Sequence, residues 1–170
     1  MKKIILFIML AISASAIAQI TLPGTKVQFT LPNGEWVYQS TITKDPHTHI
    51  YLYIYMGGTV VDSTGDTILP CLRVYVNERY TKNVYDMVYE RYLQQPFETI
   101  DQFTEDIPKE GMGHIGAYEA PIEGKSYQFR MISFVSNNMA FEFKAETTAD
   151  TYKDFDKKFA DILQTIKIVK

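Results

Sequence analysis

The stretch from residue 125 to residue 170 constrains the fold most, because it reads as strand, tight turn, strand and amphipathic helix. Asn137 and Asn138 suit a two-residue hairpin turn, since asparagine tolerates positive φ. One face of the strand after this turn carries Met139, Phe141, Phe143 and Ala145. The other face carries Ala140, Glu142, Lys144 and Glu146. Alternation with a period of two predicts a strand with one buried face and one partly hydrated face.

An amphipathic helix is predicted directly after this hairpin. Thr147 and Asp150 resemble a capping box at its start. One side of the helix carries the apolar residues Tyr152, Phe155, Phe159, Ile162, Leu163 and Ile166. Because this spacing follows the helical period, we expect the helix to cover the Phe141 and Phe143 face of the sheet. Each fully buried phenylalanine contributes about 1.5–3 kcal/mol to such a contact.

The beginning of the chain has the three parts of a secretory signal. Lys2 and Lys3 precede an apolar run over residues 4–12, and Ala16 to Ala18 forms an A-x-A cleavage sequence. The apolar run is shorter than the roughly 20 residues that cross a bilayer. We therefore expect residues 1–18 to be removed during export, which leaves a periplasmic or secreted protein without a transmembrane segment. An uncleaved anchor is the alternative interpretation.

The remaining residues, 19–170, have the length of a single domain. Removal of Lys2 and Lys3 from 17 basic residues leaves 15 against 20 acidic residues, a net charge of −5. This acidic balance argues against nucleic acid as a partner, because nucleic acid requires a basic surface. Cys71 is the one cysteine, so it has no partner for an intramolecular disulfide. We expect it to be a small buried residue, and a reactive thiol or an intermolecular bridge is the alternative.

The first half of the domain alternates in ways that predict four strands. These strands fall within residues 27–29, 36–43, 49–56 and 69–77. Leu31 to Gly34 contains the pair Asn-Gly, which favours a tight hairpin turn. Gln19 to Pro23 reads as a loose arm before the first strand.

A central helix should begin after Asn83, with Asp86 in its first turn, and end before Pro96. Residues 97–103 are expected to form a short edge strand or a loop, and residues 114–118 another strand. Two helices separated by runs of strands predict an α+β fold, an αβα sandwich around a largely antiparallel sheet.

Three tyrosines on one strand are the most distinctive candidate binding residues. Tyr51, Tyr53 and Tyr55 point to one side of their strand. Tyr75 and Tyr38 are expected to extend this face on neighbouring strands. Tyrosine offers a large ring with a polar tip, which is typical of platforms for sugars, peptides or proteins. The alternative is structural, because aromatic cross-strand pairs stabilise a sheet by about 0.2–1 kcal/mol each and a helix can cover them.

His47 and His49 are the candidate metal ligands, since their spacing places both imidazoles on one side of a strand. A zinc site needs three or four protein ligands, and His114 is the remaining histidine. A solvated loop is the alternative. The turn from Asp62 to Asp66 resembles a calcium loop but lacks the distal glutamate of an EF-hand, so we expect a hairpin turn. No cofactor is expected.

Two segments carry a resemblance to a known fold group. The opening LPNGEW sequence, Leu31 to Trp36, and the closing strand, strand and helix that end in Ile162 to Ile168 resemble the PsbP-like fold group. This group includes PsbP, a Ran-release factor and DcrB-type envelope proteins. The resemblance implies an αβα sandwich around an antiparallel sheet and a role in binding or assembly. It carries no functional residue over to this chain.

These observations favour an exported, non-enzymatic module that binds an envelope protein. One alternative is a small-ligand or metal-binding protein that uses the tyrosine face with His47 and His49. Another is a hydrolase with an unrecognised pair of carboxylates. The sequence contains no G-x-S-x-G, phosphate-binding loop or H-E-x-x-H motif.

Overall fold

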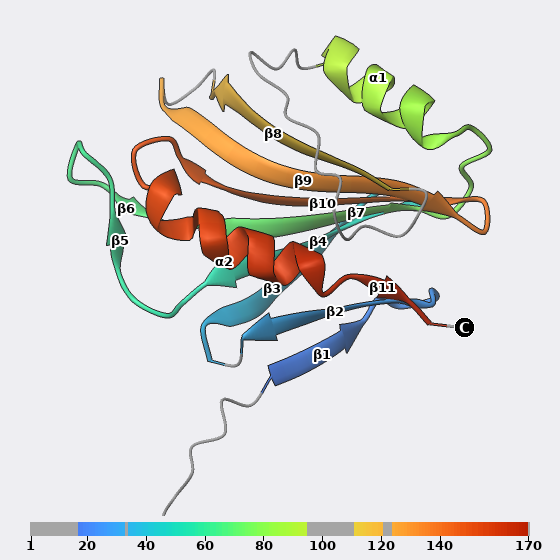
Figure 1. The fold of residues 1–170 in the computed structure, drawn as a ribbon, viewed down its shortest axis with the longest axis horizontal. Helices are drawn as coiled ribbons and strands as arrows, with labels where there is room; N and C mark the ends of the chain where they lie inside the picture. The colour runs from blue at the N-terminus through green and yellow to red at the C-terminus, as the bar shows by residue number, and fades with distance from the viewer. Residues whose placement is uncertain (1–16, 33, 95–110, 121–123, 170) are drawn as a thin grey trace, which may run out of the picture.

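The computed structural model describes residues 17–32, 34–94, 111–120 and 124–169. Figure 1 shows how their strands and helices are arranged. Along the chain these elements are β1 (Ile17–Thr21), β2 (Val27–Pro32), β3 (Trp36–Asp45), β4 (Thr48–Tyr55), β5 (Val60–Val61), β6 (Thr67–Ile68), β7 (Cys71–Asn77), α1 (Val84–Gln94), β8 (Gly111–Glu119), β9 (Ser126–Ser136), β10 (Met139–Thr148), α2 (Tyr152–Gln164) and β11 (Lys167–Ile168).

Three predictions concern residues outside this part of the chain. They are the body of the secretory signal in residues 1–16, the helix stop at Pro96 and the segment 97–103. Neither α1 nor α2 is long and apolar enough to cross a membrane.

A six-stranded antiparallel sheet forms the centre of the fold. Its strand order is β3-β4-β7-β10-β9-β8, and every neighbouring pair is antiparallel. A second sheet has the order β1-β2-β11, and β5 pairs with β6. Asn137 and Asn138 have φ values of 52° and 60°, which confirms the tight turn between β9 and β10. The predicted α+β class with a largely antiparallel sheet is therefore confirmed.

The register defines two faces of the six-stranded sheet, because directly paired residues point the same way. One row across the strands consists of Tyr51, Val74, Phe143 and Ile132. The next row, which points to the opposite face, consists of Leu52, Arg73, Lys144, Met131 and His114. α2 and the second sheet cover the first face, which we call the α2 face, and α1 packs against β9 on the other, the α1 face (Figure 1). The predicted αβα sandwich is thus confirmed, with a second sheet beside α2.

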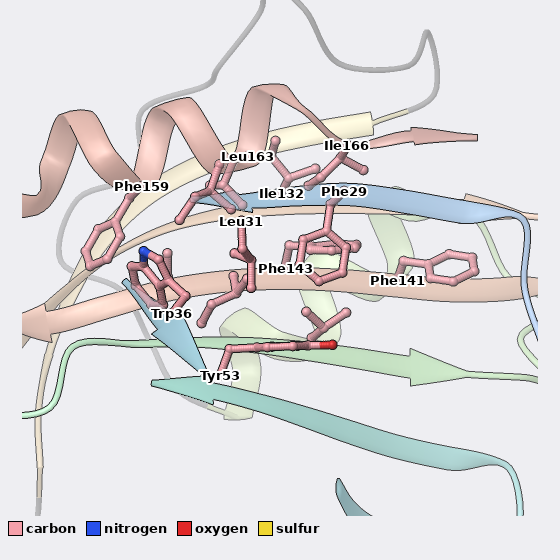
Figure 2. Packing of buried hydrophobic residues seen from close by; sticks show 14 of the residues in the cluster. Phe29, Leu31, Trp36, Tyr53, Ile132, Phe141, Phe143, Phe159, Leu163 and Ile166 are labelled. Atoms are coloured by element: carbon pink, nitrogen blue, oxygen red, sulfur yellow. The ribbon is translucent and has the colours of Figure 1, made fainter. Parts of the chain in front are cut away.

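The core lies between the α2 face, α2 and β2. Phe143 and Phe159 are fully buried there, as expected from the alternation in β10 and the helical stripe in α2. Phe29 of β2 meets Phe143 edge to face, with ring centroids 5.3 Å apart (Figure 2). Each of these rings contributes about 1.5–3 kcal/mol through burial. The predicted cover of the phenylalanine face by α2 is confirmed, and β2 shares it.

The second sheet corrects two predictions about the first residues of the domain. The expected loose arm, Gln19 to Pro23, is wrong at its start, because β1 pairs with β2 and sets Ile20 opposite Phe29. Gly34 has a φ of 79°, as a tight turn requires, but β2 and β3 belong to different sheets. The turn therefore moves the chain from one sheet to the other and does not close a hairpin.

The predicted start of α1 is confirmed, whereas the predicted cap of α2 is wrong. Asn83 caps α1 as expected, since its Oδ1 accepts a hydrogen bond from the backbone N–H of Asp86 at 3.0 Å. The capping box that was expected at Thr147 is wrong, because β10 continues to Thr148 and α2 has Thr151 as its N-cap. The Thr147 hydroxyl lies 2.8 Å from that of Thr151, so it serves a local hydroxyl cluster and not the helix end.

Candidate functional site

The middle tyrosine of β4 belongs to the core. Tyr53 is only 5% exposed, and its ring meets that of Phe29 edge to face at 5.5 Å. Figure 2 shows it on the side of the sheet that carries Phe143. Burial, and then the neighbouring Tyr38 and Tyr51, raises the pKa of Tyr53 to about 12. Its ring is therefore packed within the protein and offers no platform at the surface.

The other tyrosines of the predicted face separate into two groups. Tyr51 and Tyr55 are half-buried and pack against the core beside Tyr53. Tyr75 pairs with Ile50, so it points to the α1 face, and its predicted grouping with these three is wrong. The register explains this result, because Tyr75 is one residue out of phase with the row that contains Tyr51.

Tyr38 is the tyrosine of this face that remains exposed. It lies on β3 opposite Tyr53, with ring centroids 5.7 Å apart, and its hydroxyl is 2.7 Å from that of Thr41. Tyr55 is held at the other end of the row by the ring of Phe155, 4.9 Å away. The cross-strand pairing that we considered as the structural alternative is therefore present in the fold.

The two candidate metal ligands lie beside the turn between β3 and β4. His49 Nδ1 is 3.2 Å from the Thr43 hydroxyl, and its Nε2 is 3.7 Å from a carboxylate oxygen of Glu78. His114 is buried on β8, four strands away from β4 in the sheet, or about 19 Å at the usual strand spacing. At that distance His114 cannot bind the same metal ion as His47 and His49. Among the described residues no group of three histidine, cysteine or acidic side chains is placed to hold a metal.

A buried carboxylate on the α1 face is the polar feature that the sequence analysis missed. Glu146 is 2% exposed, although the alternation placed it on a partly hydrated face. Arg73 and Lys144 each place a nitrogen 2.9 Å from one of its oxygens. The hydroxyl of Tyr118 donates to it at 2.9 Å, and the thiol of Cys71 lies 3.6 Å away.

The surroundings of this cluster favour the ionised form of Glu146 and the protonated forms of Cys71 and Tyr118. Burial opposes ionisation of Glu146, but Lys144 and Arg73 outweigh it and lower the pKa of Glu146 below its ordinary value. Burial, and then the negative charge of Glu146, raises the pKa of Cys71 to about 12 and also raises the pKa of Tyr118. The thiol therefore stays protonated near neutral pH, and the expected assignment of Cys71 as a small buried residue is confirmed.

Aromatic rings complete the cluster around Lys144. Its Nζ lies 4.3 Å from the ring centre of Tyr118 and 4.6 Å from that of Phe129. Tyr127 stacks on Tyr118 at 5.5 Å. A cation over aromatic faces is stabilised by the ring electrons, especially where water is excluded. The spacing of Lys144 and Glu146 within one strand was the one sequence signal for this arrangement, and it is common on exposed strands.

The acidic turn between β5 and β6 is paired with a lysine from another part of the chain, Lys125, which lies just before β9. The Nζ of Lys125 lies 2.5 Å from Asp62 Oδ2 and 2.7 Å from Asp66 Oδ2. Asp62 Oδ1 accepts hydrogen bonds from the backbone N–H groups of Thr64 and Asp66, at 3.0 and 2.9 Å. The hydrogen bond from Lys125, and then that from Thr64, lowers the pKa of Asp62. A lysine ammonium thus lies between the two carboxylates and neutralises them, and the predicted hairpin turn is confirmed.

A polar pocket of about 240 Å³ lies where this turn meets the start of α2. Its walls include Ser63, Lys125, Ser126, Thr148 and Asp150. Asp150 accepts a hydrogen bond of 2.5 Å from the backbone N–H of Ser63. This contact is the largest of the effects that lower the pKa of Asp150 to about 2. The charged groups of the pocket are therefore already bonded, Lys125 to Asp62 and Asp150 to the backbone of Ser63, and these bonds fasten the turn to the domain.

The comparisons with known proteins concern the fold. No family model matches the chain, and a search of curated proteins found no match. The solution structure of cyanobacterial PsbP (CyanoP) from Synechocystis sp. PCC 6803 is similar, with a TM-score of 0.62 and 10% identity over 94% of this chain and 96% of that one. The crystal structure of LpqN, involved in cell envelope biogenesis of Mycobacterium tuberculosis, has a TM-score of 0.55 and 11% identity over 91% of each chain. The chain therefore has the PsbP-like fold.

Proposed function

We propose that this chain is an exported, non-enzymatic module that binds a protein of the cell envelope. The observation that carries the proposal is the likeness of fold to LpqN over nine-tenths of both chains, because LpqN acts in cell envelope biogenesis. The secretory signal predicted in residues 1–18 supports the same compartment independently. The protein would then be periplasmic or secreted.

The state of the buried reactive groups supports binding in preference to catalysis. A nucleophilic cysteine needs a lowered pKa, whereas the pKa of Cys71 is raised to about 12. A general acid or base needs an accessible proton site, whereas Glu146 is buried and bonded by Arg73, Lys144 and Tyr118. Both groups are better suited to hold the α1 face together.

The surface of α1 supports binding of a protein. Tyr85 and Tyr89 are 69% and 62% exposed and lie one helical turn apart. Tyrosine is enriched in protein interfaces, because its ring contributes a large area at a low entropic cost. These two residues are suitable positions for a probe that reports contact with a partner.

Export is tested by the amino terminus of the protein isolated from cells. Mass spectrometry should find Gln19 as the first residue, in the envelope or medium fraction. Replacement of Ala18 by proline should block cleavage and retain the full length. A wild-type chain that keeps Met1 and stays in the cytoplasm would overturn the export part of the proposal.

Binding is tested by a photoreactive amino acid placed at Tyr85 or, separately, at Tyr89 in the full chain. Irradiation of living cells should give one discrete adduct with another exported protein. The matched control is the same probe at Lys153, which is exposed on α2. Identical adducts from all three positions, or none from Tyr85 and Tyr89, would contradict the proposal.

A further inference from the structure

β3 is an exposed edge of the six-stranded sheet. Among the described strands it pairs with β4 alone, so the other side of its backbone faces outward. Every residue of β3 after Trp36 is exposed, except for the half-buried Ser40. Val37 and Ile42 expose 47% and 52% of their surface. A long edge strand with apolar side chains is a template for pairing with another chain.

A β-bulge in the middle of β3 decides which of its residues share a face. Val37 and Ile42 both pair with isoleucines of β4 and point to the α1 face. In a regular strand, residues five positions apart would point to opposite faces. The bulge between Tyr38 and Ser40 adds one residue to β3 and brings Val37 and Ile42 to the same side.

We propose that two copies of this chain associate through antiparallel pairing of β3 with itself. The register places Val37 of one copy opposite Ile42 of the second copy, and the two-fold axis repeats this contact. Tyr38 then lies opposite Thr41 of the second copy, and both residues belong to the α2 face. Directly paired residues must point the same way, so only the bulge makes this register possible.

The charges and the apolar surface of β3 identify a second copy as the occupant. In this register Lys44, at the second register shift of β3, comes level with Glu35 of the second copy, in the turn just before β3, so opposite charges approach each other at both ends of the paired strands. Glu35 also pairs with Lys158 at 2.6 Å and remains partly exposed. Each copy adds an aliphatic band on the α1 face, formed by Val37, Ile42, Ile50, Leu52 and Ile54. Pairing makes the two bands continuous and the sheet twelve-stranded, twice the six strands of one copy.

Analytical ultracentrifugation of the chain purified from cells tests the association. The wild type should sediment as a dimer, and Ile42→Lys should weaken dimerisation by about tenfold or more, because symmetry places the substitution in the interface twice. The control is Val61→Lys, since Val61 is equally exposed but lies on β5, and this variant should remain dimeric. Thermal unfolding of each variant establishes that it is folded. A monomeric wild type at high concentration would overturn the proposal.

Disulfide cross-linking tests the register separately. A chain with Val37→Cys and Ile42→Cys should form a covalent dimer on mild oxidation, because each new thiol faces the other one across the axis. A chain with Val37→Cys and Asp45→Cys should not, since Asp45 is exposed but lies three residues beyond the position opposite Val37. The buried Cys71 should form no disulfide in either chain. Equal cross-linking of the two variants, or cross-linking of the control alone, would reject the register.

Discussion

Replacement of Glu146 by leucine should destabilise the fold strongly. The substitution removes the buried anion and leaves the cation of Lys144, whose side chain is only 13% exposed. Arg73 is half-exposed and can turn towards water. Lys144 is therefore the group that remains buried as an unpaired charge. Removal of one partner from a buried ion pair costs about 3–5 kcal/mol. For a domain of this size, that loss lowers the melting temperature by about 6–20 °C.

A second substitution should recover much of this loss. Glu146→Leu combined with Lys144→Met replaces the ion pair by apolar side chains of similar volume, a change that is often neutral. The free energies of unfolding of the wild type, both single variants and the double variant, from urea denaturation, give the coupling energy. Glu119→Gln, on the exposed end of β8, is the control and should change stability by less than about 0.5 kcal/mol.

Two results would refute this reasoning. One is a Glu146→Leu variant whose free energy of unfolding lies within about 1 kcal/mol of the wild-type value, because an unpaired buried charge should cost more than this. The other is a double variant that is no more stable than Glu146→Leu alone. In either case Lys144 would have access to water that its burial does not indicate.

Three further predictions concern the core, a close contact and pH. Phe159→Ala should cost about 3–5 kcal/mol in chemical denaturation, because the ring is fully buried, and a loss below about 1 kcal/mol would contradict the packing. Gly116→Ala should cost about 1–3 kcal/mol in thermal unfolding, since its Cβ would lie 2.6 Å from the Phe129 ring; an unchanged melting temperature would show that the ring moves freely. The pKa of Asp62 is lowered by Lys125, so its stabilising effect is complete above about pH 4 and is lost as pH falls towards the lower folded value. Lys125→Met should therefore flatten the acid-unfolding profile below about pH 4, and an identical profile would exclude the effect.

Local patterns were sufficient for the elements at the end of the chain. The strand at β10, the turn at the asparagine pair and the apolar stripe of α2 each depend on nearby residues, and all three elements were predicted correctly. The second sheet could not be predicted in this way. β11 pairs with β2, and Lys167 lies opposite Gln28 across most of the sequence, so no local pattern indicates this pairing.

The candidate site was less accessible to prediction, since period-two alternation gives two faces but does not say which is covered. The tyrosines of β4 were correctly placed together, yet burial of Tyr53 depends on Phe29 of the second sheet. The position of Tyr75 depends on its register with β4, which no local signal specifies. Glu146 looked like an exposed acid because its partner Arg73 lies on a strand far earlier in the chain.

The tethered ammonium of Lys125 has a consequence for the conditions under which the protein can work. A bound ion leaves when its concentration falls or a chelator competes for it, and a site that needs the ion then loses its shape. Lys125 is covalently attached, so it can be neither diluted nor extracted from between Asp62 and Asp66. The proposed export would bring this turn into surroundings where free calcium varies, and the turn should keep the same conformation at every calcium level.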